Sequence, residues 1–416
     1  MSEGLVVLNA GSSSLKLALH ARPAPHADIE AGALEPLLYA HVENIGVENI
    51  GHEPRLSVRD GAGNPVDANV LKGTETRHAE VLDRIMPWLD GWDSGVSLAA
   101  AGHRVVHGGP KHAESLRLDG EILAELDALT PLAPLHQPHN LAPIRALWAR
   151  APDLPQVACF DTAFHRTQPE VAQRFALDRT LMETEGLRRY GFHGLSYDYI
   201  AEQLPAVAGP AAEGRVVVAH LGHGASMCAL KRRVSMASTM GFTALDGLPM
   251  GRRCGDLDPG VMLYLLEQKG WTPAQVSDLL YRRSGLQGVS GLSDDMALLL
   301  DCDRPEAWEA VDLFCYRAGR ELGSLAAALG GLDVLVFTAG IGEHAAPVRR
   351  RICEDAAWLG VRLDTEANAA HARRISADTS AVAVYVIPTD EEAVIARDTA
   401  RLCFAEDTGA EEGDSL

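Results

Sequence analysis

Apolar runs interrupted by small polar residues recur along the chain. Residues 5–19, LVVLNAGSSSLKLAL, have valine and leucine on both sides of a Gly/Ser centre, a pattern that predicts a strand, a turn and a second strand. A similar stretch, RVVVAHLGHGASMCAL, returns at 215–230, about 200 residues later. We therefore predict two similarly built halves, related by an internal duplication.

Helical periodicity follows these strand-like stretches. It lies around residues 74–90, 139–150, 258–268, 305–330 and 390–404. Strands with glycine-rich turns followed by long helices are typical of the α/β class, in which helices cover the sheets. A ligand is then expected in the cleft between the two halves.

Two segments stand outside this pattern. Residues 27–72 are predicted to be β-rich and irregular, and they contain the tandem repeat VENIGVENIG at 42–51, which we interpret as a tolerated duplication in a loop. The tail from Ala405, AEDTGAEEGDSL, has five acidic residues and no basic one. Such a composition is typical of a disordered segment.

The composition is that of a globular protein with room for two domains. The 416 residues are 47% hydrophobic and 23% charged, and no apolar stretch approaches the roughly 20 residues that a spanning helix requires. The N-terminus shows no basic region followed by an apolar one, so we expect no secretion signal and a cytoplasmic location. The net charge of −20 disfavours nucleic acid and anionic membranes as partners.

The cysteines favour neither disulfides nor a zinc site. There are seven of them, an odd number, and no CxxC pair. Reduced thiols are therefore expected.

Three glycine-rich turns are candidates for binding phosphate or nucleotide. Backbone N–H groups in such turns approach an anion closely, and serine adds hydroxyl donors. Two of the turns lie in the corresponding stretches 5–19 and 215–230, and the third is FTAGIGEH at 337–344, after the apolar run LDVLVF. The sequence contains no GxxxxGK[ST], which excludes the common P-loop.

Charged residues in apolar or glycine-rich surroundings form a second set of candidates. Arg104 interrupts a strand-like run, and Asp161 ends another. His193 is bracketed by glycines, as is the arginine pair at 252–253. Each alone is equally explained as a buried salt bridge, a helix cap or a core histidine, but together they can grip anions in a cleft. Glu391 either favours a helix dipole or holds a hydrated magnesium ion.

In their residues and in their order along the chain, these motifs resemble those of the acetate kinase family. The resemblance covers essentially the whole chain except the tail, and it is carried by VVLNAGSSSLKL, HRVVHGG, APLHQPHN, CFDTAFH, RRYGFHGLS, HLGHGAS, MGFTALDGLPMGRRCGDLDPG, FTAGIGE and IPTDEE. It implies the fold of the acetate and sugar kinase, Hsc70 and actin superfamily. This is an α/β fold with two duplicated ribonuclease H-like (actin-like ATPase) domains and a nucleotide cleft between them.

The resemblance also implies domain limits and an assembly. The N-terminal domain would consist of residues 1–160 plus 393–416, and the C-terminal domain of residues 161–392. A homodimer is expected.

The implied reaction is reversible phosphoryl transfer from ATP to acetate, giving acetyl phosphate and ADP. Arg104 and Arg253 would bind the carboxylate and neutralise the transferring phosphoryl group. Asp161 would position the acetyl group or the magnesium shell, and His193 would hydrogen-bond the equatorial oxygens in the transition state. Alignment and charge stabilisation suffice for such chemistry, because a carboxylate is already nucleophilic.

The resemblance assigns three further sets of residues. The ligands of Mg²⁺ or Mn²⁺ and its waters would be Asn9 and Glu391. The apolar surroundings of the acetate methyl group would be Val106, Leu135, Phe192 and Ala244. The nucleotide would be bound by Ser12, Lys16, His220, Leu221, Gly222, His223, Gly224, Gly340, Ile341, Gly342 and His344.

Four positions depart from the family pattern. HLGNG reads HLGHG here, with His223, and GIGEN reads GIGEH, with His344. PTNEE reads PTDEE, with Asp390, and GFTP reads GFTA, with Ala244. His223 either gives a phosphate contact that depends on protonation or merely replaces one donor by another. Ala244 should widen the acyl pocket toward propionate.

Three alternatives therefore stay open. One is a propionate or butyrate kinase of the same fold. Another is a non-catalytic nucleotide-binding regulatory protein. The third is a phosphoryl donor other than ATP, such as pyrophosphate.

Overall fold

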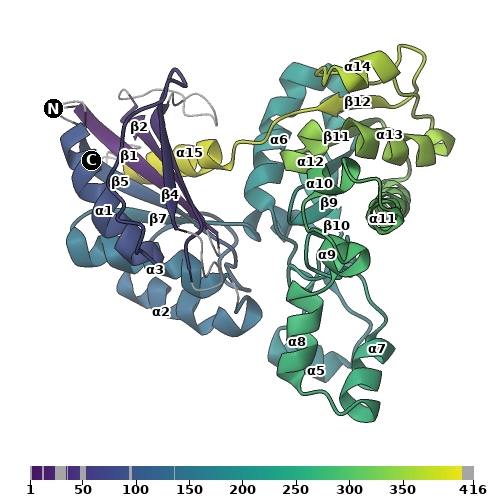
Figure 1. Ribbon diagram of the computed structural model, residues 1–416, viewed down its shortest axis with the longest axis horizontal. Helices are drawn as coiled ribbons and strands as arrows, with labels where there is room; N and C mark the ends of the chain where they lie inside the picture. Colours follow the sequence, from purple (N-terminus) through teal and green to yellow (C-terminus); the bar gives the residue numbers. More distant parts are fainter. Residues whose placement is uncertain are drawn as a thin grey trace, which may run out of the picture. The chain divides into compact units, whose positions relative to one another are not determined.

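The computed structural model describes residues 2–11, 14–23, 34, 36–46, 53–92, 96–134 and 136–404. The chain divides into two compact units, Met1–Ala163 with Asp390–Leu416, and Phe164–Thr389. Each unit has its own β-sheet (Figure 1). The tandem repeat at 42–51 lies partly outside the described residues, and the acidic tail from Ala405 lies wholly outside them.

The first unit is built on a mixed seven-stranded sheet with the order β4-β3-β2-β1-β5-β7-β6. Strands β1 to β4 are antiparallel neighbours, whereas β1, β5 and β7 run parallel. The strands are β1 Ser2–Ala10, β2 Leu15–Ala21, β3 Pro36–Glu43, β4 Arg55–Asp60, β5 Val96–Val105, β6 Leu116–Arg117 and β7 Gln156–Phe160.

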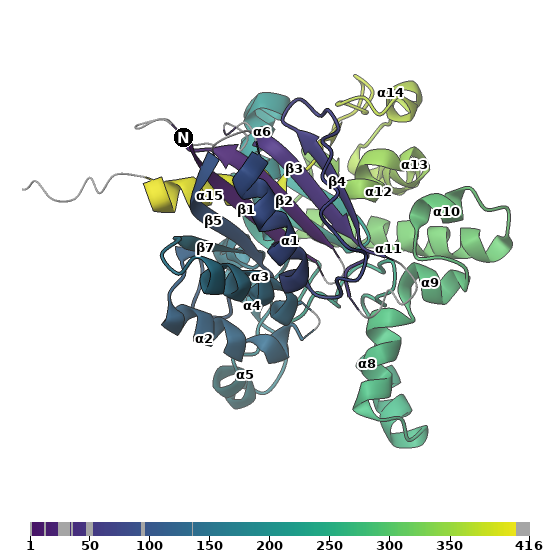
Figure 2. The ribbon, with the colours of Figure 1, turned by 60° about the vertical axis from the view of Figure 1, so that its left-hand side comes forward.

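Helices cover both faces of this sheet. They are α1 His78–Gly91, α2 Gly120–Ala128, α3 Gln137–Arg150 and α15 Glu391–Phe404. Figure 2 shows α1 and α15 on opposite sides of the sheet. Successive side chains of a strand point to opposite faces, so Ala101 packs in the core cluster with residues of α1, whereas Gly102 faces Ile395 and Thr399 of α15. A Cβ at position 102 would lie 2.1 Å from Thr399 Oγ1, so the close approach of α15 to the sheet requires glycine there.

The second unit has a five-stranded sheet with the order β10-β9-β8-β11-β12. Its strands are β8 Arg215–Leu221, β9 Ala225–Lys231, β10 Val234–Ser238, β11 Val334–Thr338 and β12 Ala383–Val386. Strands β8 to β10 are antiparallel neighbours, and β8, β11 and β12 are parallel. The order and directions therefore match those of β3-β2-β1-β5-β7 in the first unit, which confirms the predicted duplication.

The helices of the second unit are α4 Glu170–Gln173, α5 Arg179–Glu185, α6 Gly194–Ala208, α7 Pro259–Leu263, α8 Pro273–Arg282, α9 Gly285–Ser290, α10 Met296–Leu300, α11 Pro305–Leu329, α12 Ala339–His344, α13 Ala346–Asp355 and α14 Thr365–Ala369, with the π-helical turn η6 Tyr264–Gln268. Helix α6 packs in one core cluster with β8, β9 and β11. Helix α11 contacts β8, β9 and β10.

The five predicted helices are confirmed as α1, α3, α7 with η6, α11 and α15. Helix α6 was not predicted, because buried residues on several of its sides, such as Leu195, Tyr197, Ile200 and Leu204, leave no clear polar face. Among the described residues, no helix combines the length and the apolar character needed to cross a membrane.

Candidate active site

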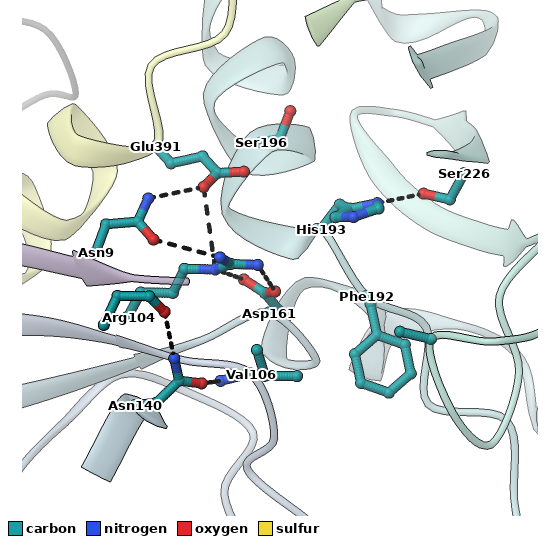
Figure 3. A network of polar contacts seen from close by, with 12 residues as sticks. Asn9, Arg104, Val106, Asn140, Asp161, Phe192, His193, Ser196, Ser226 and Glu391 are labelled. Atoms are coloured by element: carbon teal, nitrogen blue, oxygen red, sulfur yellow. Dashed lines mark hydrogen bonds and ion pairs between the residues drawn. The ribbon is translucent and has the colours of Figure 1, made fainter. Parts of the chain in front are cut away.

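The carboxyl ends of β5 and β7 bring Arg104 and Asp161 together in the first unit. Arg104 is the last but one residue of β5, and Asp161 follows β7 directly. Because the two strands are parallel neighbours, their carboxyl ends meet at one edge of the sheet. Arg104 Nε donates to Asp161 Oδ1 at 3.0 Å and Nη2 donates to Oδ2 at 2.6 Å (Figure 3). The ion pair is thus held by two hydrogen bonds, and its carboxylate residue, Asp161, is buried with 1% exposure.

Asn9, at the end of β1, connects this pair to the start of α15. Its Nδ2 donates to Glu391 Oε2 at 3.1 Å and to Glu392 Oε1 at 2.9 Å. Its Oδ1 accepts from Arg104 Nη1 at 3.3 Å (Figure 3). Burial alone would lower the pKa of Arg104, but the charges of Asp161 and Glu391 outweigh it and raise that pKa. The guanidinium is thus permanently charged.

The residues at this edge fit a hydrated magnesium ion. Mg²⁺ is usually held by one or two carboxylates together with waters and substrate phosphates. Glu391 supplies a carboxylate, and Lys16 Nζ lies 3.9 Å from the neighbouring Glu392 Oε1. Among the described residues, no group of three or more His, Cys, Asp or Glu residues is placed to hold a metal ion.

Asn140, on α3, ties two site segments of the first unit together. Its Nδ2 donates to the Ala10 carbonyl at 2.6 Å, and its Oδ1 accepts from Val106 N–H at 2.9 Å. Val106 is 3% exposed. Sequence reasoning missed Asn140, although APLHQPHN contains it. Ser12 and Leu135 lie outside the described residues.

His193 and Arg253 converge above Gly224 in the second unit. A Cβ at position 224 would lie 2.9 Å from Arg253 Nη2 and 3.2 Å from His193 Nε2. Arg253 Nη1 donates to the Ala244 carbonyl at 2.6 Å. His193 has a left-handed backbone with φ of 57° at the start of α6, a conformation that is rare outside glycine and concentrates at functional sites. Arg253 Nη2 and His193 Nε2 therefore meet over a residue without a side chain.

The HLGHG turn is tied to the MGRRCGD segment through His223. Gly251 N–H donates to the His223 carbonyl at 3.0 Å. The His223 ring lies 3.1 Å from Asp294 Oδ2, which also accepts from Arg252 Nε at 2.7 Å. Burial alone would raise the pKa of Asp294, but His223 and Arg252 lower it below its ordinary value. Arg252 and Asp294 were not assigned a role from sequence.

The predicted third glycine-rich turn forms the start of α12, directly after β11. Gly340, Ile341 and Gly342 lie in its first turns, and a Cβ at Gly340 would meet no heavy atom within 4 Å. The buried Arg349 donates to the carbonyls of Gly342 and Glu343 at 2.9 and 2.8 Å and so stabilises this turn. The side chain of His344 is 80% exposed.

The predicted residues are thus distributed over both units. Asn9, Arg104, Val106, Asp161 and Glu391 come together in the first unit. Phe192, Ala244 and the nucleotide-binding candidates from His220 to His344 belong to the second.

These features define the class of the protein. Two sheets with the same strand pattern, each with polar residues at the carboxyl ends of its parallel strands, are those of an α/β protein with the actin-like ATPase fold and duplicated domains. A family model described as the acetokinase family matches residues 4–397. The chain belongs to the acetokinase family.

Individual relatives agree with this assignment. An acetate kinase of Rhodopseudomonas palustris is 56% identical over 406 residues, covering 97% of this chain and 99% of the relative. The crystal structure of Porphyromonas gingivalis acetate kinase has a TM-score of 0.81 at 36% identity, covering 95% of this chain and 98% of that chain. The crystal structure of a propionate kinase from Francisella tularensis has a TM-score of 0.86 at 33% identity, covering 97% and 100%.

Proposed function

We propose that this protein is an acetate kinase, which transfers the γ-phosphoryl group of ATP reversibly to acetate and gives acetyl phosphate and ADP. The observation that carries the proposal is the convergence of Arg253 Nη2 and His193 Nε2 above Gly224. A transferring phosphoryl group spreads negative charge over its equatorial oxygens, and preorganised donors stabilise that charge. The names of the relatives supply the acceptor, acetate.

Arg104 is the proposed carboxylate-binding residue of the first unit. Nε and Nη2 of Arg104 both donate to the Asp161 carboxylate, and these two bonds fix the plane of the guanidinium. The remaining N–H groups can then bind an oxyanion in one orientation. Val106, Leu135, Phe192 and Ala244 are proposed to surround the methyl group of the acid.

Asn9 and Glu391 are the proposed metal-binding residues. Magnesium held there would neutralise part of the phosphate charge of ATP. Lys16 and Ser12 are proposed to contact phosphate from the first unit. The turns that contain His220 to Gly224 and Gly340 to His344 are proposed to bind the phosphates and the adenosine from the second.

Domains, assembly and location are proposed as follows. The proposed domains comprise residues 1–160 with 393–416, and 161–392, and each boundary lies three residues from that of the two compact units described above. A cytoplasmic location and a homodimer are proposed, and the homodimer is supported by an exposed apolar run in α7 and η6, where Val261, Met262, Leu263 and Tyr264 are 38% to 53% exposed. Contiguous exposed apolar patches often mark an interaction site.

A propionate kinase is the second candidate, and Ala244 is the observation that favours it. The resemblance to the family implies proline at this position, and alanine lacks the ring carbons that would narrow the acyl pocket. One extra methylene in such a pocket changes discrimination by only about 1–3 kcal/mol. The same fold therefore serves either acid.

The experiment that tests the proposal is acyl phosphate formation, trapped as the hydroxamate, with acetate, propionate and butyrate side by side. We expect turnover that requires ATP and magnesium, with acetate preferred. Preference for propionate would replace the acetate assignment by the second candidate. Failure with all three acids and with both ATP and pyrophosphate would overturn the kinase proposal.

A further inference from the structure

Two histidine rings stack in the second unit, and each ring meets a serine hydroxyl. The ring centroids of His193 and His220 lie 4.2 Å apart, with an interplanar angle of 16°. His193 Nδ1 lies 2.8 Å from Ser226 Oγ, and His220 Nδ1 lies 2.7 Å from Ser196 Oγ. Figure 3 shows the first of these contacts. Both rings thus have their Nδ1 atoms occupied by a group that can either donate or accept.

Tyr197 decides the direction of the hydrogen bond to His193. Its hydroxyl lies 2.5 Å from Ser226 Oγ, and its side chain is wholly buried. Burial raises the pKa of Tyr197 well above its ordinary value, so the phenol keeps its proton. If Ser226 donated to Tyr197, the phenol proton would have no acceptor among the residues that the structure describes, which costs about 1–3 kcal/mol. Tyr197 therefore donates to Ser226, and Ser226 donates to His193 Nδ1.

Thr389 plays the same part for His220. Its Oγ1 donates to Ser196 Oγ at 2.9 Å. The Ser196 hydroxyl then has its own hydrogen available for His220 Nδ1. The two rings are served by separate but equivalent chains of two hydroxyl groups, which are named here the Tyr197 relay and the Thr389 relay.

A neutral imidazole whose Nδ1 accepts a hydrogen bond must carry its proton on Nε2. The Nε2 atoms are directed to the HLGHG turn: that of His193 to the point above Gly224 that Arg253 also reaches, and that of His220 to within 4.0 Å of a Cβ placed at Gly222. Two stacked rings at 4.2 Å would repel one another if both were charged.

We propose that the Tyr197 relay and the Thr389 relay hold His193 and His220 as neutral imidazoles with their protons on Nε2. The turn that would bind phosphate then receives two N–H donors of fixed orientation. This inference rests on the proposed phosphoryl transfer and adds positioning residues to it: Tyr197, Ser226, Ser196 and Thr389. None of the four needs to touch the substrate to affect the rate.

The direct test is ¹⁵N-histidine NMR of the full chain, with His193→Gln and His220→Gln used for assignment. We expect both residues of the parent protein to show a protonated Nε2 and a bare Nδ1. Tyr197→Phe should shift His193 toward the Nδ1-protonated form and leave His220 unchanged, and Thr389→Val should do the reverse. Protonation of Nδ1 in the parent, or no change of His193 in Tyr197→Phe, overturns the proposal.

The kinetic test uses the same variants with matched controls. We expect Tyr197→Phe to lower kcat about 10- to 100-fold, a fraction of what removing a transition-state donor costs, with the KM values for ATP and acetate nearly unchanged. Tyr197→Phe/Ser226→Ala should be no slower than Ser226→Ala, because the relay acts as a unit. Thr389→Ser should retain the activity that Thr389→Val loses, because serine keeps the hydroxyl group. Tyr385→Phe removes a tyrosine hydroxyl on β12, as Tyr197→Phe does on α6, and should leave kcat unchanged.

The two readouts separate failure of this proposal from failure of the proposed function. The NMR signature requires no turnover, so it reports the tautomers even if acetate proves not to be the acceptor. If acetate kinase activity is present and Tyr197→Phe, Ser226→Ala and Thr389→Val all keep the parent kcat, the positioning role is wrong. If the tautomers are as expected and no phosphoryl transfer is found, the proposed function is wrong and the relays serve another anion.

Discussion

Asp161 binds the guanidinium of Arg104 through two parallel hydrogen bonds, Nε to Oδ1 at 3.0 Å and Nη2 to Oδ2 at 2.6 Å. Such a pair sets the plane of the guanidinium as well as its position. The contact joins residues 57 positions apart in the chain, and it forms because two parallel strands end at the same edge of the sheet. Its geometry leads to the first prediction.

Arg104→Lys should lower kcat/KM for acetate by about 100-fold or more, because lysine keeps the charge but cannot make the two parallel bonds that orient the fork. Steady-state kinetics with hydroxamate trapping measures this effect. Arg145→Lys is the matched control, since Arg145 forms its ion pair with Asp127 on the surface of the same unit. Equal activity of the two variants would contradict the role given to Arg104.

Gly224→Ala should abolish most of the activity while the protein stays folded. The added Cβ would lie 2.9 Å from Arg253 Nη2 and 3.2 Å from His193 Nε2, so one or both side chains must move. A displacement of about 1 Å can cost about 100-fold in rate. Gly120→Ala is the control, because no heavy atom lies within 4 Å of a Cβ there. An unchanged kcat with Gly224→Ala would argue against the convergence of the two donors at the reacting group.

Glu391→Gln should weaken metal binding by about 10-fold or more, since a neutral amide oxygen is a poorer ligand for a hard cation than a carboxylate. The measurement is the Mg²⁺ concentration for half-maximal rate, together with direct Mn²⁺ binding to the protein with ADP. Chelation of the metal should abolish turnover of the parent enzyme. Glu354→Gln, at an exposed position of α13, serves as the control and should retain the parent affinity.

Ala244→Pro should raise the preference for acetate over propionate by about 10-fold, which corresponds to the lower end of the discrimination available for one methylene. The Ala244 carbonyl that accepts from Arg253 Nη1 is retained in proline, so the arginine contact can persist. The ratio of kcat/KM for the two acids is the quantity to compare. A ratio that stays the same would remove Ala244 from the acyl pocket.

The pH dependence of stability should change in His165→Gln. Burial lowers the pKa of His165 to about 4, and its ring nitrogens lie 2.9 Å from Ser235 Oγ and the Phe192 carbonyl. The unfolded chain binds the proton below about pH 6.5, so the native protein loses stability as the pH falls from about 6.5 to about 4, by at most ~1.4 kcal/mol per pH unit for this residue.

Urea unfolding at several pH values in this range measures the effect. The slope of the free energy of unfolding against pH should be smaller in His165→Gln than in the parent. Identical slopes in the two proteins would show that His165 is not held neutral.

Local sequence patterns were enough for some of the elements and for many of the site candidates. The strand pairs at 5–19 and 215–230 and the five periodic helices were readable because their signal lies within about 20 residues. Burying a charged group costs free energy unless a partner compensates it. Charged residues in apolar or glycine-rich stretches were therefore recognisable as site candidates, and they are Arg104, Asp161, His193 and Arg253. Their roles came from the resemblance to a family and not from the pattern.

The residues that position those candidates were not readable. Asn140, Ser226 and Thr389 lie within motifs that carry the resemblance, but no local feature distinguishes them from the other polar residues there. Thr389 meets Ser196 across 193 positions, and Asn140 meets the Ala10 carbonyl across 130. Such partners become visible only when strands and helices are assembled.

The sequence by itself determined the α/β class, the duplicated halves and the chemical types available to the site, because hydrophobic periodicity and glycine-rich turns act locally. Only the tertiary structure decided which groups meet and in what orientation. Asp161 binds both sides of the Arg104 fork, His193 and Arg253 converge over Gly224, and hydroxyl groups reach Nδ1 of two stacked histidines. Strand register and helix packing fix these contacts, and both depend on long-range burial of apolar surface.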